Sequence, residues 1–248
     1  MLNIQNASFA YSKRRALHAV TMQVDEGRTC LLIGRNGSGK SSLLRLAAGL
    51  RAPTAGTVQW RGENTSAIPP ARRARSVAWV SQRSMLAIDV TVRDVVDFGA
   101  VHGASSISAE ALLHELALEP LAHRRFHELS GGEQQRCIVA RALRQHADGG
   151  LLVLDEPLAN LDPAESVRVI EALRQRCRRG AVVVAAMHDL SLVGQWADDV
   201  AVLDGGVLTA FGVATRVLQS SVLSSAFGCK FVGVSGELSV QLPPRQVD

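Results

Sequence analysis

The chain has 248 residues, of which 47% are apolar and 20% charged, so it can form a sizeable core and is not intrinsically disordered. A net charge of +4 and an aromatic content of 4% argue against a surface built to bind nucleic acid, which needs strong basic charge and stacking rings. The four cysteines are widely separated and predict reduced thiols of a cytosolic protein, with neither a zinc site nor a disulfide framework.

No part of the sequence predicts a membrane span or a secretory leader. The longest uninterrupted apolar run covers residues 181–187, whereas a helix needs about 20 such residues to cross a bilayer. The N-terminal segment lacks the apolar stretch of a signal peptide. We therefore expect the protein to act in the cytosol.

The first third of the chain predicts mainly strands. These are expected at residues 2–9, 19–24, 29–33, 57–61 and 76–80. A helix is predicted over residues 40–50, because Leu43, Ala47 and Leu50 recur at helical spacing. Proline and glycine separate the later strands and indicate turns there.

Helical periodicity replaces the strand signals between residues 91 and 121, and another helix is predicted to begin at Ser130. Alternation then resumes, with strands expected at 151–155, 181–187 and 200–203, and helices at 163–178 and 190–196. Alternating strands and helices predict an α/β protein with a mostly parallel, doubly wound core sheet. The helical middle is an insertion into that core.

The strongest chemical signal is the segment GRNGSGKS, which runs from Gly34 to Ser41 and matches G-x-x-x-x-G-K-[ST] between a predicted strand and a predicted helix. Glycines let backbone N–H groups turn toward a phosphate, and a helix N-terminus adds about half a positive charge. Lys40 is expected to reach the β- and γ-phosphates, and the Ser41 hydroxyl to bind Mg²⁺. The alternative is a glycine-rich turn that matches by chance.

Two carboxylates, Asp155 and Glu156, follow the apolar run LLVL. Such a run predicts a buried parallel strand, and ligands of open α/β sheets bind at the carboxyl ends of the strands. Asp155 suits the binding of Mg²⁺, and Glu156 suits a general base that polarises an attacking water. A solvated acidic turn is the alternative.

The segment LSGGEQQR covers residues 129–136. Ser130 and Glu133 have the spacing of a capping box at the start of an amphipathic helix. The cap does not account for Gly131 and Gly132, which look like a second surface where backbone N–H groups can approach a phosphate.

Together, the phosphate loop, LSGGEQQR, LLVLDEP and His188 after a strand resemble the nucleotide-binding subunit of an ABC transporter, in the family's order and over residues 2–212. The resemblance implies a P-loop NTPase with an N-terminal antiparallel β part. It implies a single domain over residues 1–248: a core with its β part at about 1–90 and 150–212, a helical subdomain at about 91–149 and a C-terminal extension at about 213–248. Within that extension, a short β-hairpin is predicted in residues 233–248.

The resemblance also assigns roles to residues whose chemistry is ambiguous on its own. Tyr11, the only tyrosine, corresponds to the aromatic residue that stacks on adenine, although an amphipathic tyrosine at a strand end is the alternative. Gln82 corresponds to the glutamine that contacts Mg²⁺ and the γ-phosphate, and His188 to the histidine at the γ-phosphate. Asp162 lies in the loop that crosses to the partner subunit, and it is also a good N-cap before Pro163.

The expected site therefore has three groups of residues. Those expected to bind ATP are Tyr11, Gly34, Arg35, Asn36, Gly37, Ser38, Gly39, Lys40, Ser41, Ser42, Ser130, Gly131, Gly132, Glu133 and Asp162. Those expected to bind Mg²⁺ are Ser41, Gln82 and Asp155. Those expected to act in ATP hydrolysis are Lys40, Gln82, Glu156 and His188.

In the family, two subunits pair head to tail, and residues 130–132 of one cap the ATP held by the other. A chain with one such domain and no span resembles a bacterial importer subunit at the cytoplasmic face of the inner membrane, paired with a separate permease and an external substrate-binding protein. Residues 71–82, 91–99 and 217–228 resemble importers of iron–siderophores, haem and cobalamin. The segment after Gly99 departs from that group, and the arginines at 72, 73 and 75 also fit a solvated helix face.

A soluble ABC ATPase that acts as an assembly scaffold, as in iron–sulfur cluster assembly, is the alternative function. It would share every ATP motif. Residues 83–102 distinguish the two, because in a transporter they form part of the groove for a permease helix.

Overall fold

The computed structural model describes residues 1–12, 14–82, 89–100, 107–145, 148–234 and 237–240. Much of the segment expected to face a permease, including His102 and Gly103, lies outside these described residues. The helices among them include none with both the length and the apolar character that crossing a bilayer requires.

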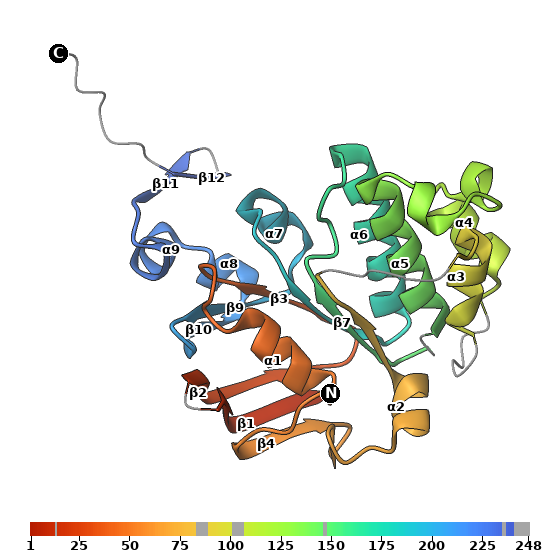
Figure 1. The fold of residues 1–248 in the computed structure, drawn as a ribbon. Coiled ribbons are helices and arrows are strands. Elements are labelled where there is room, and N and C mark those ends of the chain that lie inside the picture. The colour runs from red at the N-terminus through yellow and green to blue at the C-terminus, as the bar shows by residue number, and fades with distance from the viewer. Residues whose placement is uncertain (13, 83–88, 101–106, 146–147, 235–236, 241–248) are drawn as a thin grey trace.

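A six-stranded sheet forms the centre of the molecule, in the order β10-β9-β3-β8-β7-β6 (Figure 1). Its strands are β3 (Thr29–Ile33), β6 (Val77–Val80), β7 (Leu151–Asp155), β8 (Val182–Ala186), β9 (Asp199–Asp204) and β10 (Val207–Val213). All neighbouring pairs are parallel except β9 and β10, which form an antiparallel hairpin at one edge.

A second, antiparallel sheet has the order β2-β1-β4-β5. It consists of β1 (Leu2–Tyr11), β2 (Arg14–Val24), β4 (Ala55–Trp60) and the short β5 (Glu63–Asn64). Helix α1 (Lys40–Ala47) lies between the two sheets (Figure 1). The predicted α/β P-loop fold with an antiparallel N-terminal part is confirmed.

The remaining helices surround the other face of the central sheet and its edges (Figure 1). They are α2 (Pro70–Ser76), α3 (Val92–Phe98), α4 (Ala109–Glu115), α5 (Gly131–Gln145), α6 (Pro163–Arg178), α7 (Leu190–Trp196), α8 (Ala214–Val217) and α9 (Ser220–Phe227). Two single 3₁₀ turns, Glu119–Leu121 and Phe126–Glu128, connect α4 to α5. The predicted C-terminal hairpin is also present, as β11 (Phe231–Val234) and β12 (Glu237–Val240).

Alternating side chains of the central strands divide the core into two hydrophobic clusters. In β3, Cys30 and Leu32 join α1 and the antiparallel sheet, whereas Leu31 and Ile33 join the helices on the opposite face. Both faces of a parallel sheet are therefore buried, which explains the uninterrupted apolar runs of its strands. The four cysteines are free thiols, of which three are buried and Cys229 is exposed.

The predicted helix over residues 40–50 is three residues too long. Helix α1 ends at Ala47, and Gly49 follows with φ of 67°, a left-handed conformation that glycine adopts without the strain caused by a Cβ atom. Leu50 is therefore not part of the helix's buried face and is 44% exposed.

Candidate active site

The phosphate loop occupies the connection between buried strand β3 and helix α1. Gly39 has φ of 107°, and a Cβ atom there would lie 2.7 Å from the carbonyl oxygen of Ala16 and 2.9 Å from Leu17. Only glycine lets the loop pack this closely against β2. The fold therefore holds the loop in a fixed shape, with its backbone at the N-terminus of α1, where an anion is stabilised.

Lys40 is the first residue of α1 and is 7% exposed. Its Nζ donates hydrogen bonds to the carbonyl oxygens of Gly34, at 2.7 Å, and Arg35, at 3.2 Å. Burial lowers the pKa of Lys40, and the carboxylates of Glu156 and Asp155 work against that shift. The ammonium thus lies inside the site beside the loop, as binding of phosphate oxygens requires.

Ser38 provides a test of whether the loop fits a phosphate group. Its side chain is 3% exposed, and its Oγ has no hydrogen-bond partner. A buried hydroxyl without a partner is costly, and a phosphate oxygen would satisfy it. The loop glycines, Lys40 and this hydroxyl together fit the polyphosphate of a nucleotide.

Asp155 ends strand β7 and is 3% exposed. Burial raises the pKa of its carboxyl, and a hydrogen bond with Ser41 works against that shift. Hydroxyl, carboxylate and amide oxygens are the ligands that Mg²⁺ prefers, usually together with substrate phosphates. Ser41 and Asp155, with Gln82 nearby, therefore fit this cation, although no three His, Cys, Asp or Glu side chains in the described part of the chain cluster as a metal site.

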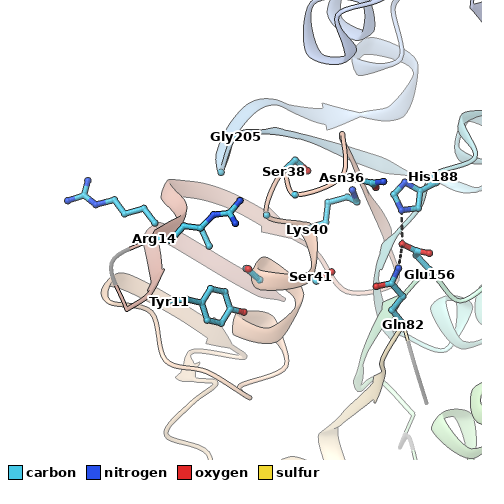
Figure 2. Close-up of a pocket in the computed structure, with 16 residues that line it drawn as sticks. Tyr11, Arg14, Asn36, Ser38, Lys40, Ser41, Gln82, Glu156, His188 and Gly205 are labelled. Carbon is cyan, nitrogen blue, oxygen red and sulfur yellow. Dashed lines mark hydrogen bonds and ion pairs between the residues drawn. The ribbon is translucent and has the colours of Figure 1, made fainter. Parts of the chain in front are cut away.

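Glu156 is at the centre of a hydrogen-bonded group. Its Oε1 accepts from Nε2 of Gln82 at 2.9 Å and lies 2.6 Å from Nε2 of His188, as the dashed lines in Figure 2 show. The Glu156 side chain is 20% exposed and its backbone has φ of 56°. The ends of strands β6 and β8 thus bring two distant residues, Gln82 and His188, to the carboxylate that follows β7, at the same edge of the sheet.

Tyr11 lies at the end of β1, on the opposite side of the phosphate loop from Glu156 (Figure 2). Tyr11 is 41% exposed, and its ring packs edge to face against that of Phe9, with the ring centroids 4.7 Å apart. Partial burial would raise the pKa of Tyr11, but hydrogen bonds with Ser42 and Arg45 outweigh that effect and lower it. Arg45 donates to the Tyr11 hydroxyl at 2.9 Å. The ring is therefore fixed by its hydroxyl while much of its surface stays available for stacking.

One cavity of about 520 Å³ joins these groups except Asp155, which lies outside its lining, and this volume is in the usual range for a small-molecule site. The predicted residues that line it are Tyr11, Asn36, Gly37, Ser38, Gly39, Lys40, Ser41, Ser42, Gln82, Glu156 and His188. Gly34 and Arg35 lie beside it and accept the hydrogen bonds of Lys40.

Four further polar or glycine positions in this lining were not predicted from the sequence. Arg14 and Arg15 come from the start of β2, and Gly205 and Gly206 form the turn between β9 and β10. A basic pair three and four residues after Tyr11 and a double glycine were available as signals. Their proximity to the phosphate loop depends on tertiary structure.

Ser130, Gly131, Gly132 and Glu133 lie outside the lining of this cavity. The predicted capping box is confirmed, since the Ser130 N–H donates to the Glu133 carboxylate at 2.7 Å and the Glu133 N–H donates to the Ser130 hydroxyl at 3.3 Å. A Cβ atom on Gly132 would lie 2.8 Å from the carbonyl oxygen of Asn160. Packing within the chain therefore accounts for one of the two glycines.

Asp162 also lies outside the cavity lining and begins α6. Its carboxylate accepts from the Glu165 N–H at 2.8 Å, and the Glu165 carboxylate accepts from the Asp162 N–H at 3.3 Å. With Pro163 at the first helical position, the predicted N-cap is confirmed.

Cleavage of a nucleoside triphosphate requires a fixed loop that binds the phosphates and carboxylates beside it. This site has both, so the molecule is a P-loop NTPase. The family model of the ABC transporter matches residues 17–159. The chain therefore belongs to the ABC transporter family, as a subunit that binds and hydrolyses ATP.

Among similar proteins are two hemin import ATP-binding proteins HmuV. That of Roseobacter denitrificans is 39% identical over 92% of this chain and 88% of its own length. That of Rhodopseudomonas palustris is 35% identical over 100% of this chain and 96% of its own length. The predicted resemblance to the importer group is confirmed.

Solved structures agree on the fold. An ATP-binding subunit of an ABC transporter superposes with a TM-score of 0.78 and 25% identity, over 88% of this chain and 91% of that one. A nucleotide-free ATP-binding cassette from an ABC transporter gives a TM-score of 0.77 and 23% identity, over 90% and 95% of the two chains.

Proposed function

We propose that this chain powers the import of haem or a related metal chelate through a separate membrane permease. The observation that supports this most directly is the 39% identity to a hemin import ATP-binding protein over 92% of the chain. The same likeness favours an importer over the alternative of a soluble assembly scaffold. The chain would then lie at the cytoplasmic face of a bacterial membrane, and an external binding protein would deliver the substrate.

In the proposed binding mode, the adenine ring stacks on Tyr11, which is worth about 1–3 kcal/mol for a base on an aromatic ring. The phosphates lie on the loop, where the backbone N–H groups, Ser38 and Lys40 bind their oxygens. Ser41, Gln82 and Asp155 would hold Mg²⁺, which supplies positive charge to the phosphate oxygens when bound. Arg14 and Arg15 add positive charge at the same cavity.

Hydrolysis then depends on Glu156 as the group that orients and polarises the attacking water. Its Oε1 is already fixed by Gln82 and His188, at 2.9 and 2.6 Å. Such prior positioning counts, because phosphoryl transfer gains most of its acceleration from orientation and placed charge.

The segment 130–133 supports a head-to-tail dimer of two copies. It stands at the N-terminus of the 15-residue helix α5, outside the cavity of its own chain, and Ser130 and Gly131 are exposed. A helix N-terminus stabilises an anion. In this proposal it caps the ATP held by the other copy, so that ATP binding closes the dimer and hydrolysis lets it open.

A permease would contact the helical part of the chain around α3. Phe98, at the end of α3, is 43% exposed, which is unusual for a large apolar side chain. Residues 83–88 and 101–106, which flank α3, lie outside the described residues.

The proposal is tested by purifying the chain with its permease in lipid vesicles and measuring ATP-driven uptake of hemin, cobalamin and an iron–siderophore in parallel. We expect hemin uptake that requires ATP and is lost in Glu156→Gln, which should still bind nucleotide, and in Lys40→Ala, which should bind it weakly. Hemin uptake no greater than that of the other two would contradict haem as the substrate, and ATP-driven uptake of none of the three would contradict the import of metal chelates. Wild-type turnover in Glu156→Gln would contradict the role of Glu156.

A further inference from the structure

Two adjacent residues of helix α5 contact the part of the chain that follows β7. Gln135 donates a hydrogen bond from Nε2 to the backbone carbonyl oxygen of Glu156, at 3.2 Å. Arg136, which is 6% exposed, forms an ion pair with Glu165 at 2.8 Å. The first of these contacts reaches the backbone of the residue that carries the proposed catalytic carboxylate.

The backbone of Glu156 needs external support. Its φ of 56° is in the left-handed region, which residues with a Cβ atom seldom adopt and which persists only where neighbouring groups hold it. The Glu156 N–H donates to the carbonyl oxygen of Ala186 at 3.2 Å, and its own carbonyl oxygen accepts from the N–H of Ala159 at 3.2 Å. Gln135 supplies a further hydrogen bond to the Glu156 carbonyl oxygen, and among these three it is the one donated by a side chain.

We propose that Gln135 is a positioning residue for hydrolysis: by holding the Glu156 carbonyl it keeps that backbone left-handed and the carboxylate between Gln82 and His188. This inference rests on the proposed role of Glu156. Rotation of the peptide would move the carboxylate away from its two partners, because the side chain follows the Cα–Cβ direction. Gln135 would act on catalysis without touching the nucleotide.

The position of Gln135 on α5 gives this contact a second consequence. Residues 130–133, which are proposed to cap the ATP of the other copy, form the first turn of the same helix. A shift of that turn would be transmitted along the hydrogen-bonded helix to Gln135, and so to Glu156. One chain's capping segment would thereby influence hydrolysis at its own site.

The test compares Gln135→Leu with Gln134→Leu in the full chain. Gln134 is a matched control, because its Nε2 donates to the carbonyl oxygens of Phe126 and Leu129, both at 3.2 Å, and not to Glu156. We expect Gln135→Leu to lower kcat about tenfold, as loss of one hydrogen bond at a positioned group does, with KM for ATP within about twofold of wild type. Gln134→Leu should keep kcat within about twofold.

Two further variants separate the outcomes. Gln135→Glu keeps the size of the side chain but replaces the donor with an acceptor, so it should lower kcat at least as much. An unchanged kcat in both Gln135 variants, or a loss equal to that of Gln134→Leu, would overturn the inference. If Glu156→Gln is inactive while the Gln135 variants are unaffected, only the role of Gln135 fails. If Glu156→Gln retains turnover, the proposed function fails as well.

Discussion

Burial of the Asp155 carboxylate lowers the free energy of unfolding of the nucleotide-free protein. Burial raises the pKa of this carboxyl above its ordinary value of 3.8, which means that folding disfavours the charged form. Below pH 3.8 the carboxyl is neutral in both states and the cost is absent. Between pH 3.8 and the higher folded-state pKa only the unfolded chain ionises, so stability falls as the pH rises, and above the folded-state pKa the full cost remains.

Replacing Asp155 with asparagine should therefore stabilise the protein at neutral pH in the absence of nucleotide and Mg²⁺, since the amide keeps the shape and removes the buried charge. We expect a higher melting temperature for Asp155→Asn at pH 7 and a difference that shrinks toward pH 4. Thermal unfolding of both proteins across this pH range checks it. A variant that is less stable than wild type at pH 7 would show that the charge is compensated in the folded state.

Most residues of the cavity could be identified from the sequence, because the phosphate loop and the strand-end carboxylates are local patterns. Glu156 was identified in this way, but its left-handed backbone and its contact with Gln135 were not. Arg14, Arg15 and the Gly205–Gly206 turn were also not predicted to be part of the site. Their place in the site arises from contacts between elements that are distant in the sequence.

Among the elements, the buried parallel strands were the easiest to predict, and β7 has its predicted bounds. Strand β10 was missed, because as an exposed edge strand with a glycine at position 212 it lacks a continuous apolar run. Helix α2 was anticipated only as a solvated face for its arginines and without bounds, because it is a short helix with no buried residue. Hydrophobic periodicity arises from buried side chains, so it does not predict elements that bury few apolar residues.

The connection between α4 and α6 includes a buried ion pair. Arg176 is 3% exposed and donates to the carboxylate of Glu115 at 2.8 and 3.4 Å. Removing one member of such a pair leaves the other without compensation. This contact ties α4, which belongs to the helical insertion, to a helix that covers the central sheet.

We expect Arg176→Ala to lower the free energy of unfolding by about 3 kcal/mol. The matched control is Arg178→Ala on the same helix, because Arg178 pairs with Glu171 at 3.0 Å with side chains 67% and 44% exposed. That exposed pair should contribute no more than about 1 kcal/mol. Urea unfolding of the three proteins measures both values. Equal losses in the two variants would show that burial of the pair does not determine its contribution.

At the scale of the whole molecule, the cavity of one chain contains most of the residues proposed to bind and cleave a triphosphate, but residues 130–133 lie outside its lining. Ser130 and Gly131 are exposed at the start of α5, and the capping box between Ser130 and Glu133 fixes this turn. The proposed dimer explains both facts, because it places each helix N-terminus against the phosphates bound by the other copy. A monomer would leave this segment without a ligand.

The mass of Glu156→Gln in solution, measured by light scattering with and without ATP and Mg²⁺, tests that claim most directly. Because this variant should bind ATP without cleaving it, we predict a monomer in the absence of nucleotide and a stable dimer in its presence. The dimer should be lost when Gly131→Trp is added to obstruct the capping segment. A protein that binds ATP and remains a monomer, or a dimer that is indifferent to Gly131→Trp, would contradict the account.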